Sequence, residues 1–171
     1  MEQKEFNRKI QKEKKEEFPV STETVSADEL EKIIYKDKHN PDKKFLKKEN
    51  GGEFKYFDLR KLMERKTQKR ELFYPLVSKE KDIVGICELE KSPYEENTYW
   101  ISFMSVKDSE QGKGYGSKLA EETFRFAKEK EINIEGSIYS DIGREKLKSK
   151  LKELSEKYGV KFIDSDEKHK V

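Results

Sequence analysis

The chain has almost none of the residues that usually build disulfides, metal sites or nucleophilic centres. Its 171 residues include one cysteine, Cys87, and two histidines, His39 and His169. A single cysteine excludes a disulfide within the chain and fits a reducing compartment. Cys87 lies in an apolar run, which predicts a buried and inert thiol. Neither histidine has cysteine or acidic partners at ligand spacing, so no metal site is expected. Nucleophilic catalysis by a Ser-His-Asp or Cys-His arrangement is not expected either.

Long apolar runs and a one-sided charge are also missing. No apolar run approaches the length of a membrane span, and the N-terminus lacks the apolar region of a signal peptide. We therefore expect a cytoplasmic protein without a membrane partner. The 38 basic and 36 acidic residues are interleaved and leave a net charge of +2. A dedicated nucleic-acid binder would show a basic excess, so a nucleic-acid partner is not expected.

The most informative stretch runs from Tyr99 to Lys128 and reads as strand, glycine turn and helix. β-Branched and aromatic residues up to Val106 predict a buried strand, and four polar residues then interrupt it. The segment Gln111–Gly116 follows, with three glycines at alternate positions. After it, one helix face is predicted from a recurring set of apolar and small residues, namely Leu119, Ala120, Thr123, Phe126 and Ala127.

A glycine turn at this junction has two interpretations. Glycine accepts positive φ and allows a ligand to approach the backbone closely. The first turn of a helix carries N–H groups without intrahelical partners, which together bind phosphate or pyrophosphate. The alternative is a plain strand–helix turn, in which glycines only make the connection tight. Two other glycine motifs fit worse, because Ser117 stands where the dinucleotide motif needs its third glycine and the P-loop lysine is missing.

The pattern Gln111-x-x-Gly114-x-Gly116 resembles the Arg/Gln-x-x-Gly-x-Gly/Ala signature of the GNAT superfamily, the Gcn5-related N-acetyltransferases. Its surroundings are also similar to that family, with two strands at hairpin spacing upstream and a strand and helix downstream. The resemblance covers roughly Glu71 to Ser165. It implies an α/β (α+β) fold with a mixed, mostly antiparallel central sheet flanked by helices. To this we add an N-terminal helical segment.

The resemblance also implies acetyl-CoA as the cofactor and places its binding site. In the family, the central strand and its neighbour splay apart, and the acyl-pantetheine arm pairs with free backbone groups of the central strand. Carried over, this points to the backbone of Met104, Ser105 and Val106. The pyrophosphate is expected on the signature turn and the start of the helix, formed by Gln111, Gly112, Lys113, Gly114, Tyr115, Gly116 and Ser117.

The candidate general base is Glu88, near the end of the second hairpin strand. Alternation places Val84, Ile86 and Glu88 on one strand face. A carboxylate on a face that begins apolar suits a general base; if the strand bends outward, Glu88 is only solvated. Glu90 shares this face but lies nearer the following turn.

Aromatic residues gather upstream of Glu88, on either side of an expected helix that Asp58 caps. We interpret them mainly as core and, alternatively, as a wall of the acceptor pocket. They are Phe54, Tyr56, Phe57, Phe73 and Tyr74.

The general acid departs from the family pattern. In the family, a tyrosine near the end of the last helix usually protonates the departing thiolate. Aligned from Gly159, that position holds Ser155, and aligned from the preceding strand it holds Leu147. Tyr139 closes the strand that should flank the acyl arm and is our candidate, whereas Tyr158 fits the apolar helix stripe and is expected in the core.

Residues 1–20 are expected to form a charged helical extension, and residues 21–171 a single acyl-CoA N-acyltransferase domain. The expected function is transfer of an acetyl group from acetyl-CoA to a primary amine by direct attack on the thioester. A small-molecule or peptide amine is the expected acceptor, and a monomer or homodimer the expected state. The alternative is a catalytically weak acyl-CoA-binding module that acts through protein partners, an alternative kept open by the missing tyrosine.

Overall fold

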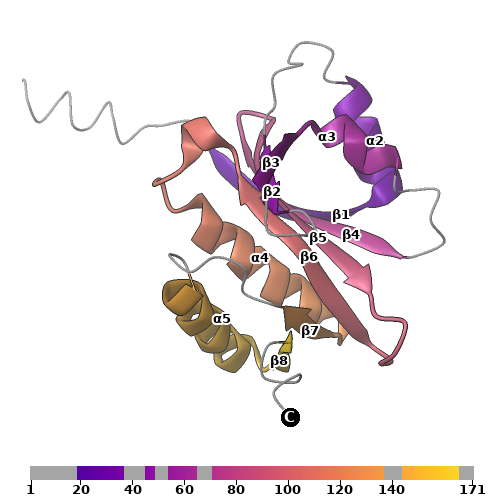
Figure 1. Ribbon diagram of the computed structural model, residues 1–171, viewed down its shortest axis with the longest axis vertical. Helices are drawn as coiled ribbons and strands as arrows, with labels where there is room; N and C mark the ends of the chain where they lie inside the picture. The colour runs from indigo at the N-terminus through magenta and orange to yellow at the C-terminus, as the bar shows by residue number, and fades with distance from the viewer. Residues whose placement is uncertain (1–18, 37–44, 49–53, 65–70, 137–143, 166–171) are drawn as a thin grey trace, which may run out of the picture.

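The computed structural model describes residues 19–36, 45–48, 54–64, 71–136 and 144–165. Its main sheet contains, in spatial order, β1 (Val20–Ser26), β4 (Leu72–Lys79), β5 (Asp82–Lys91), β6 (Thr98–Val106), β7 (Asn133–Gly136) and β8 (Phe162–Asp164). A separate hairpin is formed by β2 (Phe45–Lys48) and β3 (Phe54–Phe57). The helices are α2 (Ala27–Lys36), α3 (Leu59–Leu62), α4 (Tyr115–Lys130) and α5 (Arg144–Tyr158), with a 3-10 turn η2 (Asp108–Glu110). Figure 1 shows this arrangement.

The sheet is mixed and mostly antiparallel, as the sequence predicted. β1, β4, β5 and β6 pair antiparallel, whereas β6, β7 and β8 run parallel. Residues 1–18, where most of the expected N-terminal helical segment falls, lie outside the described residues. The described chain begins just before β1. No helix of the described residues is both long and apolar enough to cross a lipid bilayer.

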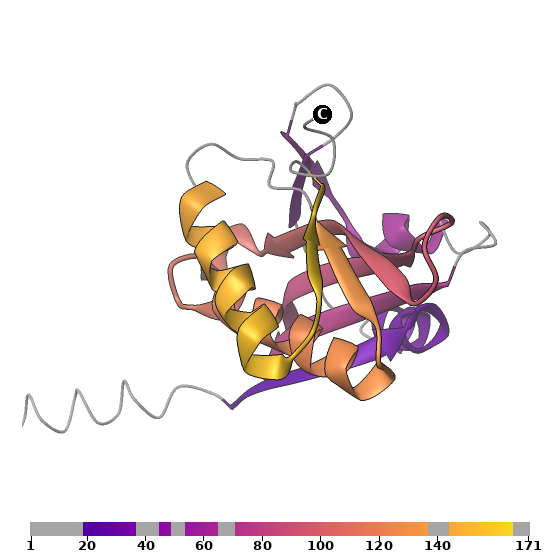
Figure 2. The same cartoon turned by 90° about the horizontal axis from the view of Figure 1, so that it is seen from below.

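Each face of the sheet has its own hydrophobic core. On one face, α4 and α5 pack on the strands through a cluster that includes Leu119, Phe124 and Leu154. On the other face, α2, α3 and β2 cover a second cluster that includes Leu30 and Phe45. Figure 2 shows the β2–β3 hairpin projecting from the sheet on the side away from α4. The central strands are therefore buried on both faces, as expected for strands that carry a functional site between two layers.

Local sequence signals place several element ends correctly. Ser26 and Glu29 form a capping box at the start of α2, with bonds of 3.0 and 3.2 Å between each side chain and the other's backbone N–H. Asp58 caps α3 by accepting from the Arg60 N–H at 2.9 Å. Gly159 follows α5 with a φ of +64°, the left-handed conformation expected after a helix C-terminus.

Two predictions of the strand pattern need correction. The edge strand β1 and the hairpin β2–β3 were not predicted. β1 is rich in hydroxyl residues, and β2 and β3 have only four residues each, so these strands gain their order by pairing. Val84 does not share a face with Glu88. A register shift between β4 and β5 inserts Val84 as an extra residue, so it packs toward α4 while Ile86 packs on the other face.

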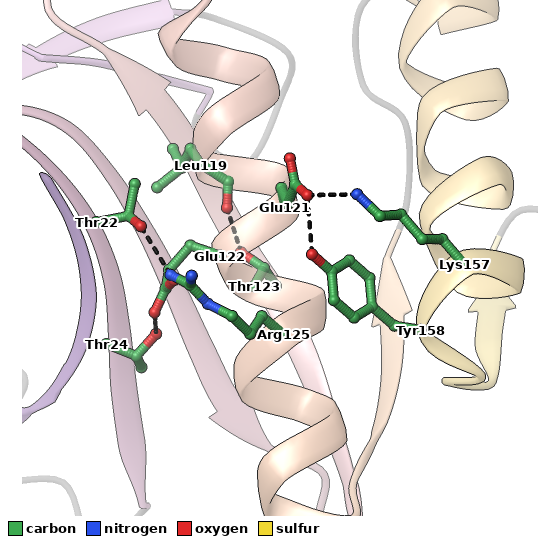
Figure 3. Close-up of polar contacts among 9 residues, drawn as sticks. All are labelled: Thr22, Thr24, Leu119, Glu121, Glu122, Thr123, Arg125, Lys157 and Tyr158. Atoms are coloured by element: carbon green, nitrogen blue, oxygen red, sulfur yellow. Dashed lines mark hydrogen bonds and ion pairs between the residues drawn. The ribbon is translucent and has the colours of Figure 1, made fainter. Parts of the chain in front are cut away.

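A polar network joins β1 to α4 (Figure 3). Glu122, which is only 6% exposed, accepts from the Thr24 hydroxyl at 3.0 Å and pairs with Arg125. The Arg125 guanidinium also donates to the Thr22 hydroxyl at 2.7 Å. Because β1 is an edge strand and reaches the core chiefly through Val25, this network ties it to the central helix.

We expect Glu122→Ala to lower the free energy of unfolding by about 1–3 kcal/mol, since it breaks a buried hydrogen-bonded pair and leaves Thr24 without that acceptor. Thermal unfolding followed by circular dichroism measures the loss. The matched control is Glu121→Ala, which removes a neighbouring carboxylate whose side chain is 41% exposed and should cost at most about 1 kcal/mol. Equal losses in both variants would contradict the role given to the β1–α4 network.

Candidate active site

The central strand β6 has one edge that is only partly paired. Toward β5, pairing runs from Tyr99 opposite Lys91 to Val106 opposite Gly85. Toward β7, the described pairing runs from Thr98 opposite Asn133 to Trp100 opposite Glu135. Within the described residues, the backbone of Ile101–Val106 thus has no β7 partner, and this stretch includes the predicted pantetheine-binding residues Met104, Ser105 and Val106. An extended ligand that donates and accepts along its length can pair with such an edge.

A β-bulge lies where this free edge begins. Glu88 pairs with Phe103 and Leu89 with Ile101, so Ser102 is the extra residue on β6. A bulge turns its backbone groups away from the regular ladder and often lies next to a reactive centre. The bulge brings Glu88, the candidate base, opposite the first residues of the free edge.

The glycine turn has the geometry of an anion site. Gly114 is the N-cap of α4 with φ +80°, and no side chain caps the helix there. The first intrahelical bond runs from the Lys118 N–H to the Gly114 carbonyl, so the N–H groups of Gly114 to Ser117 have no acceptor within the helix. A Cβ built on Gly112 (φ +78°) or Gly114 would meet nothing within 4 Å. Open space in front of these donors, at the positive end of a 16-residue helix, fits a pyrophosphate.

The side chains of Tyr115 and Lys113 in this turn make contacts that the sequence did not indicate. Tyr115 is 5% exposed and packs in the core, so it can face a cofactor only through its backbone. The Lys113 ammonium lies 3.0 Å from the Glu110 carboxylate, which holds the pKa of Glu110 below its usual value. The positive charge of Lys113 is therefore partly neutralised by Glu110 and is not directed only to a ligand. Gln111 donates to the Val106 carbonyl at 3.4 Å, which joins the signature to the end of β6.

The β2–β3 hairpin reaches the same turn. Tyr56, which is 55% exposed, donates its hydroxyl hydrogen to Asp108 in η2. Asp108 also accepts from the Gln111 side chain at 3.3 Å. Tyr56 is therefore not a core residue, whereas its neighbour in the predicted aromatic cluster, Tyr74, is fully buried. The hairpin thus links the layer of α2 and α3 to the predicted cofactor turn.

Three buried carboxylates lie on the sheet face opposite α4, each with a neutral donor. Glu88 is fully buried and accepts from the Tyr74 hydroxyl at 2.8 Å. Glu90 is 6% exposed and accepts from the Ser102 hydroxyl at 3.2 Å. Glu135 accepts from the Trp100 indole N–H at 2.8 Å. The sequence analysis missed Glu135, although alternation with the buried Ile134 places it on this face.

The family model described as the acetyltransferase (GNAT) family matches residues 15–142. The chain belongs to this family. Members of the GNAT family take their acetyl group from acetyl-CoA, so this GNAT protein is an acetyl-CoA-dependent acyltransferase. No curated protein sequence is significantly similar to it.

One solved structure supports the fold, and two others are similar at lower TM-scores. A possible acetyltransferase from Clostridium difficile 630 superposes with a TM-score of 0.51 at 14% identity, covering 78% of this chain and 89% of that one. An aminoglycoside acetyltransferase from an uncultured soil metagenomic sample gives a TM-score of 0.47 at 18% identity, with coverages of 76% and 84%. The ribosomal-protein-S18-alanine N-acetyltransferase from Escherichia coli gives 0.43 at 8% identity. The match covers 68% of this chain and 64% of that one, just under two thirds of its length.

The candidate general acids of this GNAT protein differ in what the structure says of them. Tyr139 lies outside the described residues. Tyr158 points from α5 to α4, where its hydroxyl donates to Glu121 at 2.8 Å (Figure 3). Burial, and then the bond to Glu121, raise the pKa of Tyr158. Ser155 donates to the Val160 carbonyl at 2.6 Å, which closes the end of α5. Tyr158 thus packs against the core while only partly buried, and the Ser155 bond stays within the end of α5.

Cys87 is fully buried between the strands and α4. Burial raises the pKa of its thiol to about 12. The thiol therefore stays protonated at neutral pH, as predicted, and does not act as a nucleophile.

Proposed function

We propose that this GNAT protein transfers the acetyl group of acetyl-CoA to a primary amine by direct attack on the thioester. The observation that carries the proposal is that, within the described residues, β6 pairs with β7 only up to Trp100, and that Glu88 lies opposite the stretch of β6 that follows. The backbone N–H and C=O groups of this stretch can then pair with the acyl arm, and the Glu88 carboxylate lies on the neighbouring strand. Residues 21–171 would then form the acyltransferase domain, with residues 1–20 as an extension.

We infer that the cofactor lies along β6 and on the start of α4. The pantetheine arm pairs with the backbone of Met104, Ser105 and Val106. The pyrophosphate rests on the turn Gln111–Ser117, where the N–H groups of the first helical turn supply most of the attraction. Lys113 contributes charge once it exchanges Glu110 for the phosphate oxygens.

Thioesters are activated enough for a neutral amine to attack them without a covalent enzyme intermediate. The amine nitrogen forms the new C–N bond, the C–S bond breaks, and the amine proton passes to Glu88. A backbone N–H of β6 stabilises the developing oxyanion. Because Glu88 is fully buried, the amine reaches it from the β6 side or through a bridging water. The main contribution of the site is then to hold amine and carbonyl in line.

The test is a CoA-release assay with acetyl-CoA and a panel of spermidine, kanamycin, free lysine and a peptide with an unblocked N-terminus. We expect at least one amine to release CoA with formation of its acetyl derivative, detected by mass spectrometry. Membership of an enzyme family supports turnover over the alternative of a binding module acting through protein partners. Acetyl-CoA binding without acetylation of any amine in a broadened panel would instead favour that module.

The general acid is tested by two tyrosine variants assayed side by side. We propose Tyr139 as the group that protonates the thiolate, and expect Tyr139→Phe to lower turnover about tenfold, the scale of one hydrogen bond. Acetyl-CoA affinity should change little. Tyr158→Phe should keep its activity and lose only some thermal stability, because its hydroxyl bonds to Glu121. An inactive Tyr158→Phe beside an active Tyr139→Phe would show that the helix-end tyrosine is the acid.

A further inference from the structure

Tyr74 and Glu88 form a buried cross-strand pair. Tyr74 lies on β4 and Glu88 on β5, between the register pairs Phe73–Leu89 and Leu76–Ile86. The phenol hydroxyl donates to Glu88 Oε2 at 2.8 Å. Both side chains are fully buried. The bond therefore has no competition from bulk water and sets the orientation of both groups.

Part of the surroundings of this pair is apolar. Tyr74 belongs to the core cluster under α2, α3 and β2, whose members include Leu30, Ile86 and Phe103. A carboxylate in such a layer is costly unless donors satisfy it. An aliphatic residue at position 88 would fill the same layer at no such cost. The tyrosine–glutamate pair is thus a costly choice for packing alone, which calls for another reason.

The pair also lies beside the proposed site. Glu88 pairs with Phe103 of β6, next to the Ser102 bulge and at the start of the free edge. A base in this place must keep one orientation, because a small misplacement of a catalytic group costs much of the rate. Glutamate has three rotatable side-chain bonds, and backbone position alone does not fix its carboxylate.

We propose that Tyr74 is a positioning residue that holds the Glu88 carboxylate toward the thioester, an inference that rests on the proposed role of Glu88 as base. Tyr74 touches neither acetyl-CoA nor the amine. It acts through Glu88 by holding Oε2 in one orientation through their hydrogen bond. The amine proton still passes to Glu88, and the phenol keeps its own proton throughout.

The test is Tyr74→Phe, assayed with acetyl-CoA and the best amine of the panel above. We expect kcat to fall about tenfold, the scale of one hydrogen bond, while the amine KM and the acetyl-CoA Kd change less than about twofold. The matched control is Tyr99→Phe. Tyr99 donates to Glu71 at the same 2.8 Å, but its ring packs on the α4 face, so its loss should leave kcat unchanged.

A double variant separates the two proposals. If Tyr74 acts only through Glu88, Tyr74→Phe should change kcat less than twofold in a Glu88→Gln background. A full tenfold drop in both backgrounds would overturn the positioning role and leave Glu88 as base. Unchanged turnover in Glu88→Gln alone would overturn the base and the positioning role with it. A lower Tm for Tyr74→Phe with unchanged kcat would reduce the pair to a packing element. Acetyl-CoA added during purification keeps weakened variants folded by mass action.

Discussion

The Gly114→Asp variant is expected to lose measurable acetyl-CoA binding while keeping its fold. Gly114 caps α4 with φ +80°, and a Cβ there points into open space before the first-turn N–H groups. An aspartate would fill that space and set a negative charge against the pyrophosphate. If steric exclusion of the pyrophosphate and its charge repulsion each cost about 1.4 kcal/mol of binding free energy, the affinity falls about a hundredfold. Titration calorimetry with CoA and with acetyl-CoA measures it.

The matched control for this variant is Gly159→Asp. Gly159 also has a left-handed backbone, with φ +64°, and a Cβ there meets nothing within 4 Å. It follows α5, far along the chain from the signature, so both substitutions carry a similar backbone strain of roughly 1 kcal/mol. Only the variant at the α4 start should lose the cofactor. A folded Gly114→Asp protein with wild-type affinity would refute the assignment of the turn.

Glu88→Gln is expected to lower turnover by about two orders of magnitude or more, the usual scale of general base catalysis. The amide keeps the size of the side chain and can still accept from Tyr74, so packing and the 2.8 Å bond can persist. What is lost is the ability to take a proton. Acetyl-CoA affinity should stay near wild type, because Glu88 lies on β5, on the other side of β6 from the edge proposed to bind the acyl arm. Steady-state CoA release and calorimetry on the same preparation give both numbers.

Glu90→Gln is the control that separates a base from a generally acidic face. Glu90 lies two residues further along β5, is 6% exposed and accepts from Ser102. It shares the chemistry and the face of Glu88 but pairs with Trp100, where β6 is still joined to β7. We expect its turnover to fall less than tenfold. If Glu90→Gln is the inactive variant and Glu88→Gln the active one, the base is Glu90, two residues further along β5.

Several features of this protein follow from short stretches of sequence alone. The signature Gln111-x-x-Gly114-x-Gly116 indicated the family, and its Gly114 takes a positive φ, a local need that no distant residue changes. The capping box at Ser26 and the left-handed Gly159 are equally local, since each depends on atoms within a few residues. The strands and helices from Leu72 onward were long and periodic enough to recognise.

Other features depend on contacts between distant segments. The register shift that turns Val84 toward α4 arises from pairing with β4, and no residue pattern within β5 predicts it. The edge strand β1 gains order from β4 and from the Glu122–Arg125 network of α4, about a hundred residues away. Strand alternation could predict Glu88 as a candidate base, but it could not predict that the Tyr74 hydroxyl donates to it.

The sequence by itself determined the family, the cofactor and the helix N-terminus that can hold it, because backbone geometry in a short glycine turn is a local property. Only the tertiary structure decided how the strands around the proposed site are joined. It set the pairing of Thr98–Trp100 with β7, the bulge at Ser102 and the bond from Tyr74 to Glu88. Each of these joins strands far apart in the chain, and their relative register is chosen by packing of both cores together rather than by any one strand.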